Sequence, residues 1–412
     1  MTENPRAGQT TQLQKNRTSV VTPTPRSLVF LFALASGLSV ANVYYAQPLL
    51  DSLAHEFNIS YAAIGGVITA TQVGCAISLL FLVPLGDKVE RRRLMAWQLV
   101  ALVGALIAVG AAHHFLILLL GMLAVGLLGT AMTQGLIAYA ASAADSSEQG
   151  RVVGVAQSGV FIGLLLARLF AGVVNDFGGW RNVYFLSAFC MLVIAVPLWM
   201  RLPRLTNPSS HLSYGQLMKS MMHLLGSDKV LQVRGCLALL MFASFSVFWS
   251  ALVLPLSAPP HSLSHTWIGA FGLVGVAGAL AAARAGQWAD KGYAQRTSAA
   301  ALLALLVAWW PLSLMEWSYL ALVVGIFFLD LGGQALHVTN QSMIFKTHPE
   351  ANSRLIGLYM IFYAIGSGIG GISTTATYAY AGWGGVCLLG AMLSLVAMVF
   401  WWLTRQVGTS QK

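Results

Sequence analysis

The chain has 412 residues, of which 57% are hydrophobic and 9% are charged, and its mean hydropathy is +0.72. A soluble domain carries about 25% charged residues, so this composition excludes an ordinary soluble globular protein. The formal net charge of +10 does not indicate nucleic-acid binding either, because the basic residues lie in short breaks between apolar runs and form no continuous basic surface.

A polar, basic tail over residues 1–27 comes first, and it lacks the short apolar core and small-residue cleavage site of a signal peptide. Twelve apolar runs follow, each near the roughly 20 residues that a helix needs to cross about 30 Å of hydrocarbon. They lie near residues 28–50, 62–86, 94–112, 115–140, 152–174, 183–200, 235–256, 267–285, 298–315, 317–343, 355–377 and 385–404. Runs this long and continuous favour helices over the short alternating strands of a β-barrel. We therefore predict an all-α integral membrane protein with twelve transmembrane helices.

The longest break, residues 201–234, divides the chain into a six-helix N-terminal half (28–200) and a six-helix C-terminal half (235–404), with a tail over 405–412. Within this linker the stretch YGQLMKSMMHLLGS has apolar residues at helical spacing. It predicts a short helix, either lying on the membrane surface or serving only as a linker.

Lys and Arg are distributed unevenly between alternate breaks. All of them except Arg168 and Arg181 lie in the two tails, in the central linker or at the breaks that follow even-numbered segments. Because cytoplasmic loops are enriched in Lys and Arg, this distribution predicts that both termini are cytoplasmic.

The four cysteines lie inside apolar runs without clustered spacing, which predicts neither a disulfide framework nor a metal site. The sequence also has no paired carboxylates, nucleophile motif or clustered His ligands. We therefore expect no enzyme activity and no cofactor.

The two halves resemble each other. A shift of 203 residues aligns Asp87-Lys88 with Asp290-Lys291, Arg151 with Arg354, and Gly179-Trp180 with Gly382-Trp383. Parallel six-helix repeats of this kind build a binding site at the junction of the halves in several secondary transporters.

The windows VPLGDKVERRRL and GQWADKGYAQR, which follow segments two and eight, resemble the loop motif of the major facilitator superfamily. ANVYYAQPLL, QVGCAISLLFLVPLGD and DLGGQALHVTNQS resemble a bacterial group of sugar- or drug-efflux-like permeases, which implies a bacterial cytoplasmic (inner) membrane. The first motif departs from the pattern, with Val83 and Glu90 in place of glycine. The resemblance implies a central cavity between the halves, lined by helices one, four, seven and ten.

The resemblance also assigns a gating role to the charged residues of the motif loops and of the start of helix eleven. These residues are Asp87, Lys88, Arg91, Arg92, Asp290, Lys291 and Arg354. The alternative is that they only anchor and orient the loops. A carboxylate at Asp87 is expected near the N-terminus of helix eleven, where the helix dipole and Arg354 would favour it.

Two charges, Asp330 and Arg168, lie deep within segments, where a charge costs roughly 2.5–3.5 kcal/mol on insertion scales. Asp330, Gln334, His337 and Gln341 share one face of helix ten. We predict proton coupling by Asp330, with His337 second and Arg168 as the partner of Asp330. The alternative is an ion pair between Asp330 and Arg168 that serves only as a strut between helices.

For the substrate we predict contacts with Asn42 and Tyr45, which share a face of helix one, and with Gln134, Gln334 and Phe245 on the other cavity helices. A polar wall opposite an aromatic wall would suit an amphiphilic organic molecule. Phe242, Phe245 and Phe248 form an aromatic stripe on helix seven, and the alternative for this stripe is packing or lipid contact.

The expected function is secondary active transport of a small organic solute by alternating access, coupled to protons; the resemblance to efflux-like permeases implies export as one direction. Leu164 stands where exporters of this superfamily often have proline, so the direction stays open. We expect the protein to work as a monomer in the lipid bilayer. The alternatives are an uptake permease of the same fold and a non-transporting membrane sensor.

Overall fold

The computed structural model describes residues 24–86, 88–144, 148–202, 213–278, 285, 288–347 and 352–407, and the described residues form helices joined by short loops. The N-terminal half contains α1 (Arg26–Tyr44), the 3₁₀ turn η1 (Gln47–Leu49), α2 (Leu50–Phe57), α3 (Tyr61–Ile77), the wide turn η2 (Ser78–Leu82), α4 (Val83–Leu85), α5 (Arg91–Gly110), α6 (Phe115–Ala143), α7 (Gln149–Gly178) and α8 (Trp180–Arg201). Below, this half means α1 to α8.

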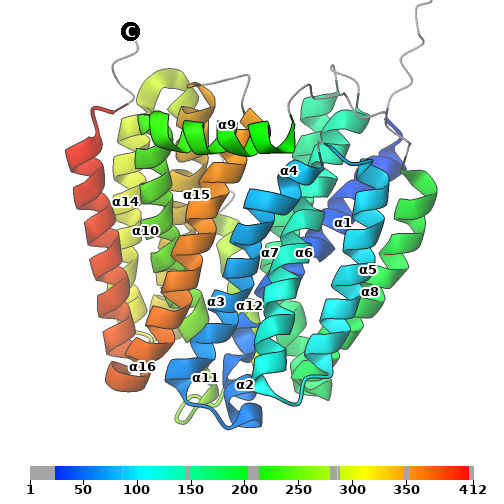
Figure 1. Cartoon of the computed structure of the whole chain (residues 1–412). Coiled ribbons are helices and arrows are strands. Elements are labelled where there is room, and N and C mark those ends of the chain that lie inside the picture. The colour runs from blue at the N-terminus through cyan, green and yellow to red at the C-terminus, as the bar shows by residue number, and fades with distance from the viewer. Residues whose placement is uncertain are drawn as a thin grey trace, which may run out of the picture.

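The linker helix α9 (Tyr214–Ser227) precedes the C-terminal half, by which we mean α10 to α16. That half contains α10 (Lys229–Ala251), α11 (Val253–Ser257), α12 (His265–Ala270), η3 (Phe271–Leu273), η4 (Ala289–Tyr293), α14 (Ala294–Ser313), α15 (Tyr319–Phe345) and α16 (Asn352–Thr404). The described chain begins and ends at the same end of the bundle (Figure 1), which we call the terminal end.

The fold confirms the prediction of a twelve-helix membrane protein. Ten helices in the described part of the chain are long and apolar enough to cross a membrane. One of them, Arg354–Thr404, has 51 residues and breaks at Gly382, whose φ of +60° favours glycine, so it supplies two spans. The remaining predicted span, near residues 267–285, falls on α12, η3 and the helical residues up to 278, and its other residues lie largely outside the described ones.

The first span is longer than predicted. Its α-helix ends at Tyr44, and the chain then continues through η1 and α2 as far as Phe57. Pro48 does not end the run because it occupies the first turn of η1, where a missing N–H costs little. Asn58 ends α2 with a φ of +50°.

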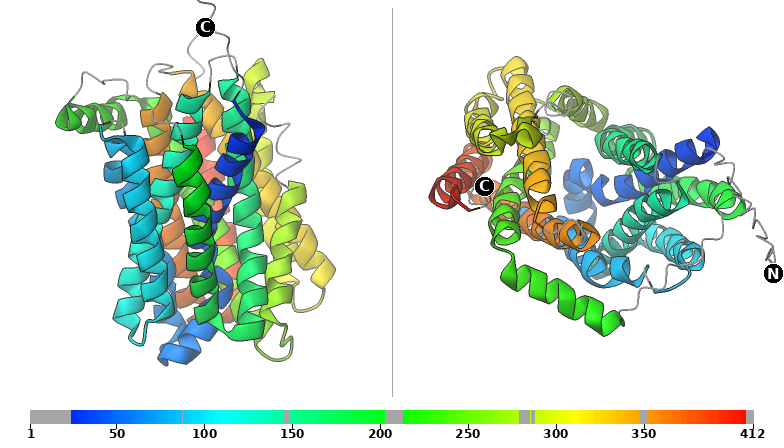
Figure 2. Two further views of the ribbon diagram at one scale, coloured as in Figure 1. Left: turned by 90° about the vertical axis from the view of Figure 1, so that its right-hand side faces the viewer. Right: turned by 90° about the horizontal axis from the view of Figure 1, so that it is seen from above.

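The perimeter of the bundle is apolar, as expected for contact with lipid. Large side chains there are strongly exposed, among them Trp97, Phe189, Trp310, Leu320 and Leu403. The linker helix α9 lies along the edge of the terminal end, crosswise to the spans (Figures 1 and 2). Its apolar residues Leu217, Met221 and Leu224 are buried, and Ser213 caps it, so the predicted linker helix is confirmed.

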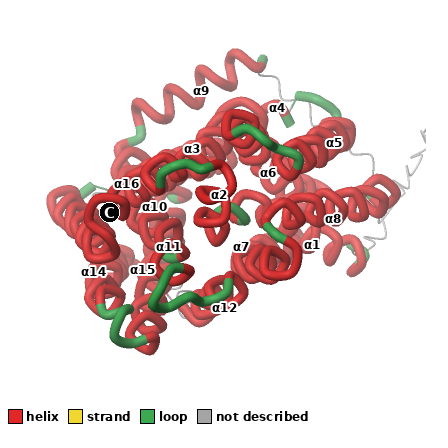
Figure 3. The backbone as a smooth tube through the Cα atoms, turned by 90° about the horizontal axis from the view of Figure 1, so that it is seen from below, coloured by secondary structure: helices red, strands yellow, loops and turns green. Residues whose placement is uncertain are grey.

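The two halves meet along two pairs of helices, α3 with α16 and α7 with α12. At the end opposite the terminal end, α2 packs on α11, and η1 packs on α10 and α12 (Figure 3). The first span therefore contributes its last turns to the interface between the halves.

Candidate functional site

A buried cation lies at the interface between the halves. Arg168, on α7, is 2% exposed. Its Nε donates to Gln47 Oε1 (3.1 Å), and its guanidinium carbon lies 3.9 Å from the ring centre of Trp249 on α10. A desolvated cation–π contact of this kind contributes about 2 kcal/mol. Arg168 Nη2 and Trp249 Nε1 are buried without a hydrogen-bond partner in the described chain.

Asp330, on α15, brings a buried anion to the same interface. It is 4% exposed, and its Oδ2 has no hydrogen-bond partner among the described residues. A Cβ at Gly275 would lie 2.9 Å from Asp330 Oδ2, and a Cβ at Gly272 would lie 3.6 Å from Arg168 Cδ. Both charges therefore pack against one turn of the same helix, and two glycines make room for them.

The rest of the predicted α15 stripe is held within the C-terminal half. His337 Nδ1 lies 2.9 Å from Tyr359 Oη, and its Nε2 lies 3.3 Å from Gln341 Nε2. The His337 ring also packs edge-on against Phe242. Gln334 is half-buried, and the neighbouring Gly333 faces the ring of Phe245.

Aromatic residues extend from this stripe to the other half. The ring of Phe242 packs on Tyr363 with centroids 4.1 Å apart, and the Tyr363 hydroxyl is hydrogen-bonded to that of Tyr44 on α1. Arg168 lies over the Tyr44 ring at 5.7 Å. This aromatic bridge (Tyr44, Phe242, Tyr363) joins the surroundings of His337 to those of Arg168.

The predicted helix-one face of Asn42 and Tyr45 turns into the N-terminal half. Asn42 is fully buried: its Nδ2 donates to Leu38 O (2.8 Å), and its Oδ1 accepts from Ser187 Oγ on α8 (2.6 Å). Tyr45 packs against Phe170 and Tyr184. In this structure both residues contact their own half, where the buried Asn42 finds on α8 the polar partner that it needs. Their contact with the substrate stays a prediction.

Gln134 is half-buried and lines a small void of about 40 Å³ between α5, α6 and the end of the second span, which Arg91 and Gln98 also line. It therefore lies inside the N-terminal half near the terminal end, away from Arg168.

Sequence comparison assigns the family. The model of the Major Facilitator Superfamily matches residues 30–309 and 234–412, which together cover most of the chain. The chain belongs to the major facilitator superfamily. The resemblance inferred from the motifs is thus confirmed, and the protein is a multi-pass, non-enzymatic secondary transporter of small solutes.

Relatives cover almost its whole length. A putative uncharacterized transporter of Escherichia coli (strain K12), YgaY, is 42% identical over 91% of this chain and 95% of its own. A probable sugar efflux transporter of Helicobacter pylori (strain G27) is 22% identical over 90% of this chain and 93% of its own.

Solved structures share the fold. A bacterial homologue of the human lysosomal transporter Spinster has a TM-score of 0.74 at 13% identity, with 93% of this chain and 97% of that one covered. The nucleoside transporter NupG has a TM-score of 0.73 at 14% identity, with 90% and 98% covered.

The superfamily motif loops are partly described. Asp87 and the side chain of Asp290 lie outside the described residues. Arg91 Nε donates to Gly86 O (3.1 Å), and its Nη1 donates to Ala138 O (3.2 Å), so it ties the loop to α6. Arg354 donates to Ser220 on α9. Lys88 is half-buried, Lys291 is exposed, and Gly292 turns the second loop with a φ of +91°.

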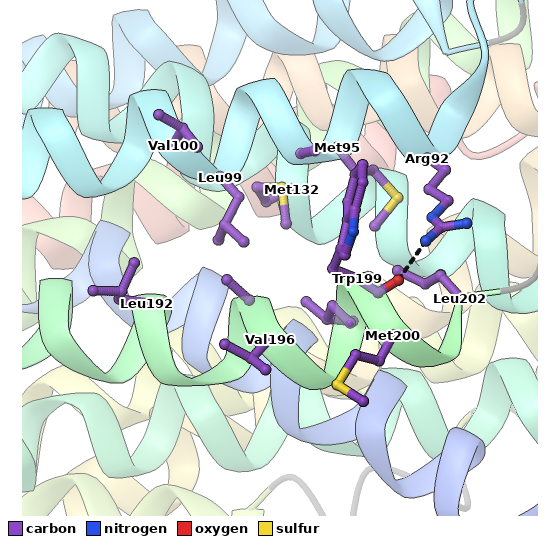
Figure 4. Close-up of a pocket in the computed structure, with 13 residues that line it drawn as sticks. Arg92, Met95, Leu99, Val100, Met132, Leu192, Val196, Trp199, Met200 and Leu202 are labelled. Atoms are coloured by element: carbon purple, nitrogen blue, oxygen red, sulfur yellow. Dashed lines mark hydrogen bonds between the residues drawn. The ribbon is translucent and has the colours of Figure 1, made fainter.

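Arg92 belongs to a different place, a crevice on the perimeter of the N-terminal half. The crevice has a volume of about 370 Å³ and lies between α5 and α8, lined by Met95, Leu99, Val196 and Trp199 among others (Figure 4). Arg92 stacks 4.6 Å from the ring centre of Trp199 and donates to its backbone oxygen. Apolar walls and a perimeter position fit lipid contact better than a polar substrate path.

Sequence reasoning missed the residues that surround Arg168. Gln47 and Tyr44 were not among the residues predicted for the site. Trp249 continues the aromatic stripe of Phe242 and Phe245 at i, i+3 and i+7, so this helical spacing could have identified it.

Proposed function

We propose that this transporter couples proton movement to the export of a small organic solute, and that Asp330 and Arg168 form the coupling site. The observation that carries the proposal is the burial of these opposite charges, from different halves, against one turn that contains Gly272 and Gly275. A buried charge is destabilised when its countercharge is removed. Protonation of Asp330 therefore removes the countercharge of Arg168 and weakens the interface in which Arg168 lies.

Arg168 transmits that change to the aromatic and polar groups around it. Its Nε is held by Gln47 of its own half, whereas Trp249 of the other half packs on its face. When Asp330 is neutral, Arg168 keeps only the aromatic face as a partner in the C-terminal half. The halves then separate more easily at this position, which is the step that alternating access requires.

His337 is the second candidate for proton transfer, and Gln334 and Phe245 are the proposed substrate contacts. All three belong to α10 or α15, beside the aromatic bridge. The bridge and Gln334 together offer aromatic faces and one amide, which suits a solute with apolar and polar parts. The relative named as a probable sugar efflux transporter supports export of an uncharged polar solute.

We further propose that the terminal end faces the cytoplasm of a bacterial cell, as the placement of Lys and Arg favours. The motif loops with Lys88, Arg91, Asp290 and Lys291 then gate the cytoplasmic end, together with Arg354 at the start of α16. The hydrogen bond from Arg354 to Ser220 of α9, at that end, supports a gating role for this contact. The protein is proposed to act as a monomer.

The test is proton movement in proteoliposomes that contain a trapped pH-sensitive dye. A growth screen of sugars and amphiphilic drugs in transporter-deficient cells supplies the solute. We expect Asp330→Asn to reduce solute-driven pH change to background, because an amide cannot take up the proton.

Glu316→Gln is the matched control, since Glu316 is an exposed acid in the loop before α15, and it should transport like the wild type. Equal thermal stability of both variants in detergent would show that folding is intact. Undiminished proton movement in Asp330→Asn would remove Asp330 from the mechanism.

A further inference from the structure

A second charged cluster joins the halves at the end opposite the terminal end. It consists of Asp51 and Ser52 on α2, Asp176 on α7, and His265 and Thr266 at the start of α12. We call it the outer latch. These elements lie close together when the bundle is viewed from that end (Figure 3). The latch is separate from Arg168 and Asp330, and the coupling site uses none of its residues.

Asp176 supplies the cap that α12 lacks in its own half. The N-cap residue Ser264 makes no side-chain capping bond. Instead, Asp176 Oδ1 accepts from His265 N (3.1 Å), and its Oδ2 accepts from Thr266 N (2.8 Å) and Thr266 Oγ1 (2.6 Å). The first turn of α12 is therefore held by a carboxylate of the N-terminal half.

The ring of His265 lies between two carboxylates of the N-terminal half. Its Nε2 is 2.9 Å from Asp51 Oδ1 and 3.0 Å from Oδ2, and its Nδ1 is 3.3 Å from Asp176 Oδ1. A neutral imidazole has one N–H and can donate to only one of these acids. An imidazolium donates to both, so one added proton creates a further charge-assisted bond between the halves.

We infer that His265 is a proton-binding site that fastens the outer end of the transporter when it is protonated. The proton comes from the external solution if the terminal end is cytoplasmic, so the sidedness rests on the proposed orientation. The geometry of the latch does not depend on that orientation or on the coupling role of Asp330.

The two charged groups that contact the His265 ring, Asp51 and Asp176, both favour the protonated form. Of the elements that pack on α12, α11 and η1 contain no titratable side chain, and α7 contributes Asp176. On α2, Glu56 is paired with Arg181, 2.7 Å away, and His55 is exposed. Partial burial opposes the charge on His265, but Asp51 and then Asp176 outweigh it and raise the pKa of His265 above its ordinary value.

The raised pKa of His265 determines at which pH the latch closes. When the halves separate, His265 loses both acids and its pKa returns toward about 6.5. Closure at the latch is therefore fully favoured below that value, and the advantage is lost as the pH rises through the raised pKa of the closed form. Each unit of difference between the two pKa values changes the closed-to-open ratio by about tenfold.

The test measures the separation of the halves at this end as a function of pH. Spin labels are attached to His113→Cys, in the turn before α6, and to Trp317→Cys, in the turn before α15, on a background without native cysteines. Both positions are exposed and make no latch contact. We expect the short-distance population of the otherwise unchanged protein to grow as the pH falls from about 8 to about 5, whereas His265→Gln should remove this dependence.

His261→Gln is the matched control, because His261 lies at the same end but bonds Tyr319 within its own half. It should keep the pH response, and so should Asp330→Asn, which separates the latch from the coupling site. If His265→Gln does not fold, Asp51→Asn replaces it, since it leaves the Asp176 cap intact and should shrink the response. A distance distribution that does not change with pH, or an undiminished response in His265→Gln or in Asp51→Asn, would overturn the inference.

Discussion

Arg234 is a basic residue that the sequence assigned to the central linker and that the structure places inside the bundle. It is 1% exposed on α10, and its Nη1 donates to Ser298 Oγ (2.8 Å) and Asn340 Oδ1 (3.4 Å). One guanidinium nitrogen therefore joins α10 to α14 and α15. The distribution of Lys and Arg that predicts cytoplasmic termini is unchanged, because Arg234 still lies near the terminal end.

Replacing Arg234 with Lys should destabilise the C-terminal half. An ammonium is more strongly hydrated than a guanidinium and cannot match its planar geometry, so we expect a loss of about 1.5–3 kcal/mol, the contribution of a hydrogen bond to a charged group. The measurement is thermal unfolding in detergent. Arg201→Lys, at an exposed position at the end of α8, should unfold like the wild type; equal unfolding of Arg234→Lys would contradict the role given to Arg234.

At the scale of residues, the sequence could not predict how each helix is rotated about its axis. The sequence shows that Tyr44 and Tyr45 occupy different faces of one helix, but it does not show which face meets the other half. The partners decide: Ser187 holds Asn42 within its own half, and the Tyr363 hydroxyl is bonded to that of Tyr44. Both partners are more than 100 residues away in sequence, so no local pattern could reveal them.

Close packing of α16 against α10 is the dominant feature at the scale of elements. The stretch GSGIGG in α16 supplies the small residues of this contact. A Cβ at Gly366 would collide with the Leu239 carbonyl oxygen, and one at Gly370 would lie 3.0 Å from both Ala243 Cα and Ser246 Cβ. Here helix approach depends on the missing side chains, as in other membrane bundles.

A single methyl group at this contact should therefore be costly. We expect Gly370→Ala to lower the unfolding temperature and the yield of folded protein, because backbone atoms of α10 cannot move aside as a flexible side chain could. Gly384→Ala serves as the control: it lies in the same long helix, and its added Cβ would meet nothing within 4 Å. If the two variants were equally stable, the contact between α10 and α16 would be looser than the structure indicates.

At the scale of the whole molecule, the number of spans and the linker helix could be predicted from the sequence, because apolar run length and helical spacing are local properties. Asp330 and Arg168 could be singled out as well, since a charge in the membrane is expensive wherever it lies. Their shared surface at Gly272 and Gly275 could not, because it depends on how α7, α15 and the helical segment that follows α12 converge.

The halves are in contact at the end opposite the terminal end, and alternating access requires that contact to break. Tyr61 on α3 and Tyr378 on α16 pack there with ring centres 6.1 Å apart. We expect a short, membrane-impermeant thiol cross-linker added to intact cells to join Tyr61→Cys to Tyr378→Cys and to stop solute transport. In the linked protein, a cysteine at Gln341, near the terminal end of α15, should stay reactive in inside-out vesicles. Cross-linking His261→Cys to Tyr319→Cys, a pair in contact within one half, should leave transport intact. Continued transport after complete linkage of the first pair would mean that the halves do not separate at this end during the cycle.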